Sequence, residues 1–82
     1  MNYAIEFKPK SIKDLKKTPQ AEVDKIFIKI ELMKLNLHGD VKKLTNFTPE
    51  YRLRVGNYRI LFEVEDKAIV IYRVVSRKDA YS

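Results

Sequence analysis

The stretch YRLRVGNYRILFE, residues 51–63, decides the fold because it predicts a β-hairpin with two chemically different faces. Gly-Asn, a recognised signal for two-residue hairpin loops, lies at its centre and should form the turn. This turn places Arg54 directly opposite Arg59, and it places Arg52 opposite Leu61. The rest of the chain is interpreted from this pairing.

Side chains alternate along a strand, so the hairpin has one apolar face and one basic face. The residues expected on the core face are Tyr51, Leu53, Val55, Tyr58, Ile60, Phe62 and Val64. Arg52, Arg54 and Arg59 share the other side, which we call the arginine face. Two like charges directly opposite each other destabilise a sheet by roughly 0.2–1 kcal/mol, so a bound polyanion would offset the Arg54–Arg59 pair. The alternative is an ordinary solvent face, on which long arginine stems cover apolar neighbours.

Composition limits the class of protein. A chain of 82 residues with 45% apolar and 34% charged residues is ordinary for one globular domain, expected over residues 1–82. The absence of cysteine excludes disulfides, a single histidine makes a zinc site implausible, and we expect no metal or cofactor. No segment predicts a signal peptide or a membrane span, so we expect a cytoplasmic protein without a membrane partner. The net charge of +6 favours an anionic partner.

The N-terminal half predicts a strand followed by two helices. The alternating segment Tyr3–Phe7 predicts the strand. Ser11 and Asp14 resemble a capping box, which predicts a short helix from Ser11 to about Lys17. The Thr-Pro pair that follows should open a long helix reaching about Leu37.

The long helix carries two apolar strips. The main one, expected to pack on the sheet, consists of Val23, Ile26, Phe27, Ile30, Met33 and Leu37. Ile28, Leu32 and Leu35 fall on nearly the opposite side. Either the first helix covers this second strip with Ile12 and Leu15, or the strip is a docking surface for a partner.

After a loop over residues 40–50 and the hairpin, the apolar, β-branched run Ala68–Val75 predicts a buried central strand. Its register depends on the preceding turn. A three-residue turn pairs Arg59 with Arg73 and puts Arg73 on the arginine face, whereas a two-residue turn puts Arg73 in the core. Because a charged residue resists burial, we expect the three-residue turn. The arginines would then form one cationic surface, made of Arg52, Arg54, Arg59, Arg73 and Arg77.

This order of elements, the YRLRVGNYRI hairpin and the terminal RVVSRKDAY together resemble the RelE/ParE superfamily of toxin–antitoxin toxins. The likeness covers nearly the whole chain and is strongest from Leu44 to Tyr81. It implies an α+β fold of the RelE-like, microbial-RNase-like type, with element order β-α-α-β-β-β. In that fold two N-terminal helices pack on one face of an antiparallel sheet, and the other face is concave and basic.

The resemblance also implies a function. RelE-like toxins cut messenger RNA in the ribosomal A site without a metal, through attack of a 2′-hydroxyl on the adjacent phosphate, and a protein antitoxin neutralises them. The positions that match catalytic residues are Arg54, Arg59, Arg77 and Tyr81. The basic residues expected to contact RNA are Arg52, Arg54, Arg73, Lys42, Lys43 and Lys78.

The chain departs from the family pattern where proton transfer is concerned. RelE has lysines at the positions of Arg52 and Arg54, and many relatives have a histidine at the position of Ser76. Arginine cannot act as a general base because its very high pKa keeps the guanidinium protonated in this pH range. Tyr81 is the best remaining side-chain candidate. Two other functions stay open, a ParE-like poison of DNA gyrase and a non-catalytic basic RNA-binding module.

Overall fold

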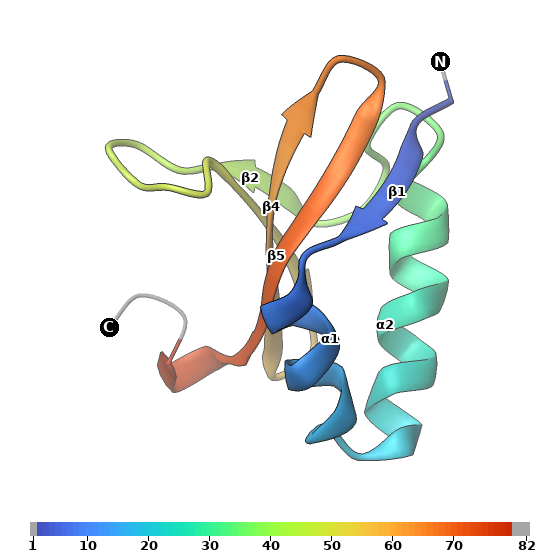
Figure 1. Ribbon diagram of the computed structural model, residues 1–82, viewed down its shortest axis with the longest axis vertical. Helices are drawn as coiled ribbons and strands as arrows, with labels where there is room; N and C mark the ends of the chain where they lie inside the picture. The colour runs from blue at the N-terminus through green and yellow to red at the C-terminus, as the bar shows by residue number, and fades with distance from the viewer. Residues whose placement is uncertain (1, 80–82) are drawn as a thin grey trace.

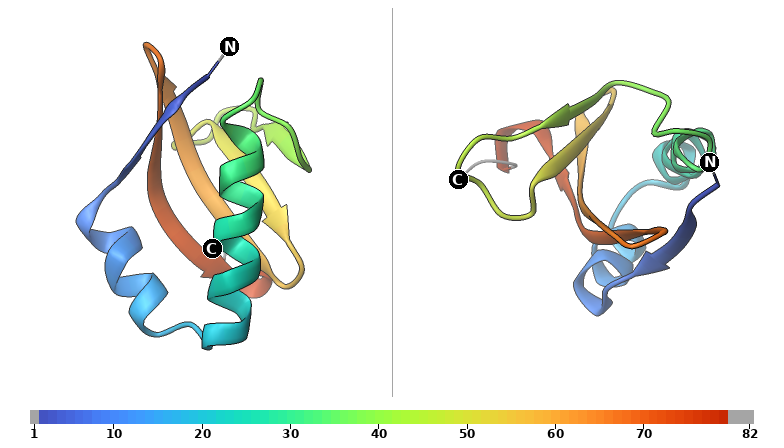
Figure 2. Two further views of the ribbon diagram at one scale, coloured as in Figure 1. Left: turned by 90° about the vertical axis from the view of Figure 1, so that its right-hand side faces the viewer. Right: turned by 90° about the horizontal axis from the view of Figure 1, so that it is seen from above.

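The computed structural model describes residues 2–79 and has the expected α+β order of elements (Figure 1). In chain order the elements are β1 (Ala4–Phe7), α1 (Pro9–Lys16), α2 (Gln20–Met33), β2 (Val41–Lys43), β3 (Tyr51–Val55), β4 (Tyr58–Glu65), β5 (Ala68–Ser76) and a short 3-10 helix, η1 (Arg77–Asp79). In the left view of Figure 2, α2 lies in front of the sheet and α1 lies to its left.

The strands form one five-stranded sheet in the order β1-β5-β4-β3-β2. Three of its four neighbouring strand pairs are antiparallel, whereas β1 and β5 run parallel. The sheet is therefore mixed rather than, as expected, wholly antiparallel. The crossover that parallel pairing requires consists of the two helices. The short strand β2 was not expected, because its three residues lie in a segment whose polar composition indicated only a loop.

The hairpin of β3 and β4 has the register that the sequence predicts. Arg54 pairs with Arg59 and Arg52 pairs with Leu61. Gly56 supplies the positive φ, +55°, that this two-residue turn requires. The like-charge pair is therefore a feature of the folded sheet, and the arginine face exists as defined.

The register between β4 and β5 differs from the expectation. Glu65 pairs with Ala68 across a two-residue turn, and Arg59 pairs with Val75, so the expected pairing of Arg59 with Arg73 is wrong. A bulge opposite Leu61 and Phe62 inserts one residue into β5 and shifts the later pairs. Arg73 consequently lies opposite Leu61, away from the core. The bulge, rather than a three-residue turn, therefore keeps Arg73 out of the core.

The core lies between α2 and the sheet. Its fully buried residues are Ile26, Ile30, Met33, Leu53, Ile60, Phe62, Ile69 and Ile71. Of the main helical strip, Phe27 stays 41% exposed and packs on Phe7 of β1, with ring centroids 5.9 Å apart. The predicted strip is otherwise confirmed, with Leu37 packed at the margin of the core.

Both helices begin and end differently from the prediction. Ser11 lies inside α1, fully buried, and its hydroxyl donates to the Lys8 carbonyl at 2.7 Å, so it is no capping residue. α2 ends at Met33 rather than near Leu37. The following backbone leaves the helix because Tyr3 N–H donates to the Lys34 carbonyl and Leu35 bridges Asn2, which ties this segment to the start of β1.

The second helical strip is exposed. Ile28, Leu32 and Leu35 are 60%, 45% and 52% exposed, and Ile12 of α1 is also exposed at 44%. The interpretation in which α1 covers this strip is therefore wrong. Leu15 instead packs against the core.

Candidate nucleic-acid interface

The strand register arranges the basic residues in two rows across the arginine face. In the row nearer the hairpin turn, Arg54 lies beside Arg59, and Arg59 lies beside Val75. In the next row the order is Lys42, Arg52, Leu61 and Arg73. Lys42 and Arg52 form a second like-charge pair. Two adjacent rows of cations on rigid strands can present several donors to a polyphosphate backbone at fixed spacing.

Asp40 lies beside the two arginines of β3. Its carboxylate approaches Arg52 Nη1 at 3.5 Å and Arg54 Nε at 3.9 Å, while its main-chain carbonyl accepts a hydrogen bond from Arg54 N–H at 3.0 Å. The two guanidinium groups differ in exposure, because the Arg52 side chain is 12% exposed and that of Arg54 is 55% exposed. Arg54 is therefore the more accessible of the two to a ligand.

Arg59 is buried, with 6% of its surface exposed. Its Nη1 donates to the carbonyls of Gly56 at 2.9 Å and Tyr58 at 3.0 Å, so the guanidinium folds back onto the hairpin turn. Such a side chain loses little further entropy when it binds a ligand, because its rotamer is already fixed.

The end of β5 brings the C-terminal segment to the same turn. Arg77 N–H donates to the Asn57 carbonyl at 2.7 Å, and Ser76 Oγ donates to Asp79 at 2.9 Å. Asn57, Ser76, Arg77 and Lys78 line a shallow cleft of about 260 Å³. The structure thus places Arg77 and the Arg59 guanidinium at one hairpin turn, although 18 positions separate them in the sequence.

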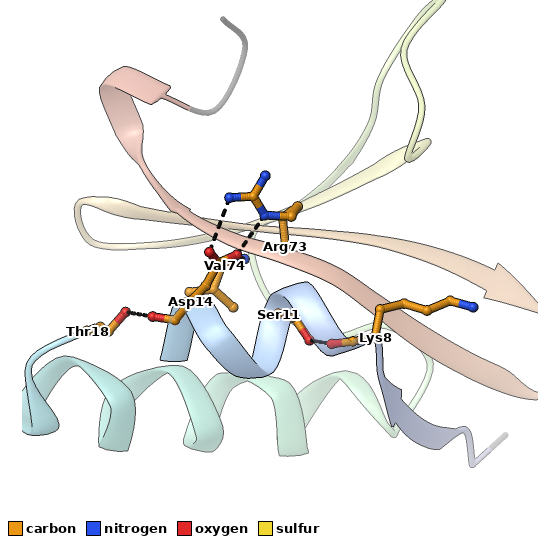
Figure 3. Close-up of polar contacts among 6 residues, drawn as sticks. All are labelled: Lys8, Ser11, Asp14, Thr18, Arg73 and Val74. Carbon is orange, nitrogen blue, oxygen red and sulfur yellow. Dashed lines mark hydrogen bonds and ion pairs between the residues drawn. The ribbon is translucent and has the colours of Figure 1, made fainter. Parts of the chain in front are cut away.

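Arg73, at the end of the second row, is bound by Asp14 of α1 (Figure 3). Its Nε and Nη2 donate to the Asp14 carboxylate at 2.7 and 3.1 Å, and Val74 N–H donates to the same carboxylate at 2.9 Å. The hydrogen bond to Asp14 is the main cause that raises the pKa of Arg73 above its ordinary value. β1 pairs with β5 only as far as Ile71, and Asp14 satisfies the strand edge beyond that point. Arg73 therefore fastens α1 to the sheet.

The remaining predicted site residues are spread more widely. Lys42 and Lys43 lie on the edge strand β2, where Lys43 is 3.7 Å from Glu50, and Lys78 is exposed in η1. Tyr81 lies outside the described residues. Tyr72 is no substitute as a proton acceptor, because desolvation and the neighbouring Glu65 raise its pKa and its hydroxyl donates to Glu65 at 3.2 Å.

Sequence reasoning missed Asp14 and Asp40 as partners of arginines. Asp14 resembled a helix cap, and Asp40 resembled a loop residue at the end of a helix. Their partners are 59 and 12 positions away, so no local pattern connects them.

Comparison with known proteins identifies the class of protein. The family model for the ParE toxin of the type II toxin–antitoxin system parDE matches residues 5–81. The chain therefore belongs to the RelE/ParE superfamily of type II toxin–antitoxin toxins, as its hairpin and C-terminal segment predicted.

The individual relatives are RelE toxins. Toxin RelE3 of Methanocaldococcus jannaschii is 41% identical over 75 residues, which cover 85% of this chain and 85% of the relative. The RelB–RelE antitoxin–toxin complex from Methanococcus jannaschii matches with a TM-score of 0.78 at 39% identity, covering 93% of this chain and 94% of that chain. The archaeal RelE–RelB complex from Pyrococcus horikoshii OT3 matches with a TM-score of 0.75 at 25% identity, covering 98% of this chain and 100% of that chain.

Within residues 2–79, neither helix has the length and apolar composition that a membrane span requires.

Proposed function

We propose that this toxin is a ribosome-dependent mRNA endonuclease that uses the arginine face and Arg77 to cleave RNA in the A site. The observation that carries the proposal is that the Arg59 guanidinium and the Arg77 main chain both bind the Gly56–Asn57 turn, beside the exposed side chain of Arg54. Folding alone does not favour the Arg54–Arg59 pair, and a bound phosphate would stabilise it.

The reaction needs no cofactor. The 2′-oxygen of the nucleotide before the scissile bond attacks the phosphorus, the bond from phosphorus to the 5′-oxygen breaks, and the products are a 2′,3′-cyclic phosphate and a 5′-hydroxyl. Negative charge accumulates on the phosphorane-like transition state. Fixed guanidinium groups stabilise that charge without reorganising, and removal of one such donor typically costs about 10²–10³-fold in rate. Arg59 and Arg77 have this role, and Arg54 holds the phosphate.

Two protons must also move. One leaves the 2′-hydroxyl, and one reaches the departing 5′-oxygen. None of the arginines can accept the first proton, because guanidinium does not lose its own proton in this pH range. We assign proton transfer to Tyr81, the one side chain among the matching positions that can give or take a proton, or to a group that the ribosome supplies. The remaining basic residues, Arg52, Lys42, Lys43 and Lys78, guide and hold the RNA backbone.

Primer extension on translated messages after induction of the toxin tests the proposal. The expected result is a set of new 5′ ends in phase with codons. Alanine at Arg77 should remove these ends while the variant still sediments with ribosomes, which separates catalysis from simple RNA binding. Loss of ribosome binding in that variant would favour a non-catalytic RNA-binding module instead.

A second candidate function is poisoning of DNA gyrase, because the matching family model describes ParE toxins. The absence of a lysine base at positions 52 and 54 and of a histidine at position 76 is also compatible with a toxin that does not cut RNA. Intact mRNA together with trapped gyrase–DNA complexes after induction would establish this candidate and exclude the first.

The toxin should also bind a protein antitoxin of acidic or mixed charge. The disordered tail of the antitoxin would fold on the second helical strip, on the arginine face or on both. The exposed strip of Ile28, Leu32 and Leu35 supports this part of the proposal, as do the two archaeal relatives solved as complexes of RelE with RelB. Replacing Leu32 by Asp should weaken copurification with the product of the adjacent open reading frame. Unchanged copurification would exclude the strip from the interface.

A further inference from the structure

The carboxylate of Asp40 lies beside Arg52 and Arg54, the two arginines to which the proposed function assigns phosphate groups of RNA. It is within 4 Å of donor nitrogens on both Arg52 and Arg54, the two neighbouring arginines of β3. A carboxylate and a phosphate oxygen are interchangeable acceptors for guanidinium groups. We propose that Asp40 is a built-in competitor for phosphate, which occupies the β3 arginines in the free toxin and is displaced by RNA.

The position of Asp40 is fixed by the sheet rather than by the carboxylate itself. Its carbonyl accepts the Arg54 N–H at 3.0 Å, immediately before β2 begins pairing with β3. This main-chain hydrogen bond places Asp40 next to Arg54 in the same row. The carboxylate can therefore swing away from the arginines while the backbone remains paired.

The side-chain contacts are loose enough to be exchanged. At 3.5 and 3.9 Å they are longer than the 2.7–2.9 Å of a charge-assisted hydrogen bond. Asp40 remains 58% exposed, so solvent and solute ions reach it. The Arg52 Nε is buried without a hydrogen-bond partner among residues 2–79, so Asp40 leaves part of the donor capacity unused. The contrast is the Asp14–Arg73 pair, which is bidentate at 2.7 and 3.1 Å.

The consequence of such a competitor is selectivity. Lys42 opposite Arg52 and Arg54 opposite Arg59 are two like-charge pairs in adjacent rows, and Asp40 offsets their repulsion in the free protein. An isolated anion has to replace the carboxylate, so its net binding free energy is small. An RNA backbone makes several phosphate contacts at once, and their combined binding free energy is enough to displace the carboxylate. Asp40 therefore lowers affinity for stray anions more than affinity for a correctly placed strand.

The inference rests on the proposed function only in taking an RNA phosphate as the ligand, so its test measures binding rather than cleavage. The probe is a fluorescent single-stranded 2′-O-methyl RNA, which lacks the nucleophile and cannot be cut. Full-length wild type, Asp40→Asn and Asp24→Asn are titrated over a range of salt concentrations. Asp24 lies on α2, where it accepts a hydrogen bond from Gln20, so its substitution changes net charge equally but away from the sheet.

The expected result is tighter RNA binding by Asp40→Asn than by Asp24→Asn, by about two- to fivefold, which is the scale of an exposed ion pair. The slope of log affinity against log salt should steepen by up to ~0.7, because one more counterion is released. Equal affinity of the two variants would overturn the inference, because net charge alone would explain any gain. Weaker binding by Asp40→Asn would also overturn it, since Asp40 would then be holding the arginines in position for RNA.

A measurement on the wild type removes dependence on the folding of a variant. The carboxyl carbon of Asp40 should change its NMR chemical shift as the RNA is added, because the carboxylate leaves its two guanidinium neighbours. A signal that stays in place at saturating RNA would contradict displacement. Codon-phased cleavage is a separate readout, so failure of the nuclease proposal and failure of this inference are distinguishable.

Discussion

Two basic regions of this toxin differ in how their charges are held. The segment from Lys8 to Lys17 contains five lysines, all exposed, and none of them forms an ion pair within residues 2–79. The arginine face carries fewer cations, but strand register, hairpin carbonyls and Asp40 fix them. Both regions contribute to the same net charge of +6.

This difference in order predicts different modes of interaction with polyanions for the lysine segment and for the arginine face. Solvated lysines attract any polyanion at long range, and salt screens that attraction. Ordered guanidinium groups lose less entropy on binding and present several donors in a fixed plane. Substitutions in the arginine face should therefore have large, specific effects, whereas substitutions in the lysine segment should have small, uniform ones.

The largest effect is expected for Arg77→Ala. Loss of a donor beside the transition state should lower the rate of mRNA cleavage by about 10²–10³-fold. Because Arg77 is exposed, thermal stability should stay within a few degrees of wild type. The matched control is Lys78→Ala, which removes the adjacent exposed cation from the same cleft. Equal losses in the two variants, measured by single-turnover cleavage, would show that charge rather than position matters.

A large effect on stability is expected for Asp14→Ala. The substitution removes three hydrogen bonds that join α1 to β5, and we expect a loss of about 2 kcal/mol in the free energy of unfolding after allowance for partial exposure. Chemical denaturation measures this loss, with Asp24→Ala as an exposed control. Activity per folded molecule should be retained. A stable but inactive variant would instead place Arg73 in the site.

An intermediate effect is expected for Arg54→Gln. RNA affinity should fall severalfold, and the slope of log affinity against log salt should decrease by about 0.7, as for one phosphate contact on a single strand. Fold stability should change little, because the like-charge pair with Arg59 is relieved while the ion pair with Asp40 is lost. Titrations with the uncleavable RNA probe at several salt concentrations measure both. An unchanged slope would remove Arg54 from the interface.

The smallest effect is expected in the lysine segment. Lys10→Gln and Lys13→Gln should each change RNA affinity by less than about twofold, and equally for every RNA sequence. The same titrations provide the measurement. A loss as large as that of Arg54→Gln would abolish the distinction between the two regions.

The sequence predicted those parts of the fold that local patterns determine. The Gly-Asn turn and strict alternation gave the register of β3 and β4, and helical periodicity identified the buried side of α2. The bulge in β5 could not be predicted, because no glycine or proline marks it and its cause is pairing with β4. The end of α2 was missed for a similar reason, since contacts of Lys34 and Leu35 with Asn2 and Tyr3, just before β1, override the helical pattern.

The sequence predicted how the arginines of the hairpin are paired, but it did not predict which carboxylates lie beside arginines. Arg54, Arg59 and Arg77 are gathered at one turn by strand pairing that the sequence allowed us to anticipate in part. The roles of Asp14 and Asp40 depend on approach in three dimensions, because a carboxylate in a helix or loop carries no mark of its partner. Arg73 shows the consequence, since its ion pair with Asp14 was not predicted.

The chemistry of the RNA ends tests the central claim most directly. A defined message is translated in a purified system with wild-type toxin, and the 5′ and 3′ ends of the fragments are identified. The account predicts codon-phased cuts with a 2′,3′-cyclic phosphate and a 5′-hydroxyl, abolished by Arg77→Ala and retained in Lys78→Ala. Full-length message throughout, or ends that appear equally without ribosomes, would contradict it.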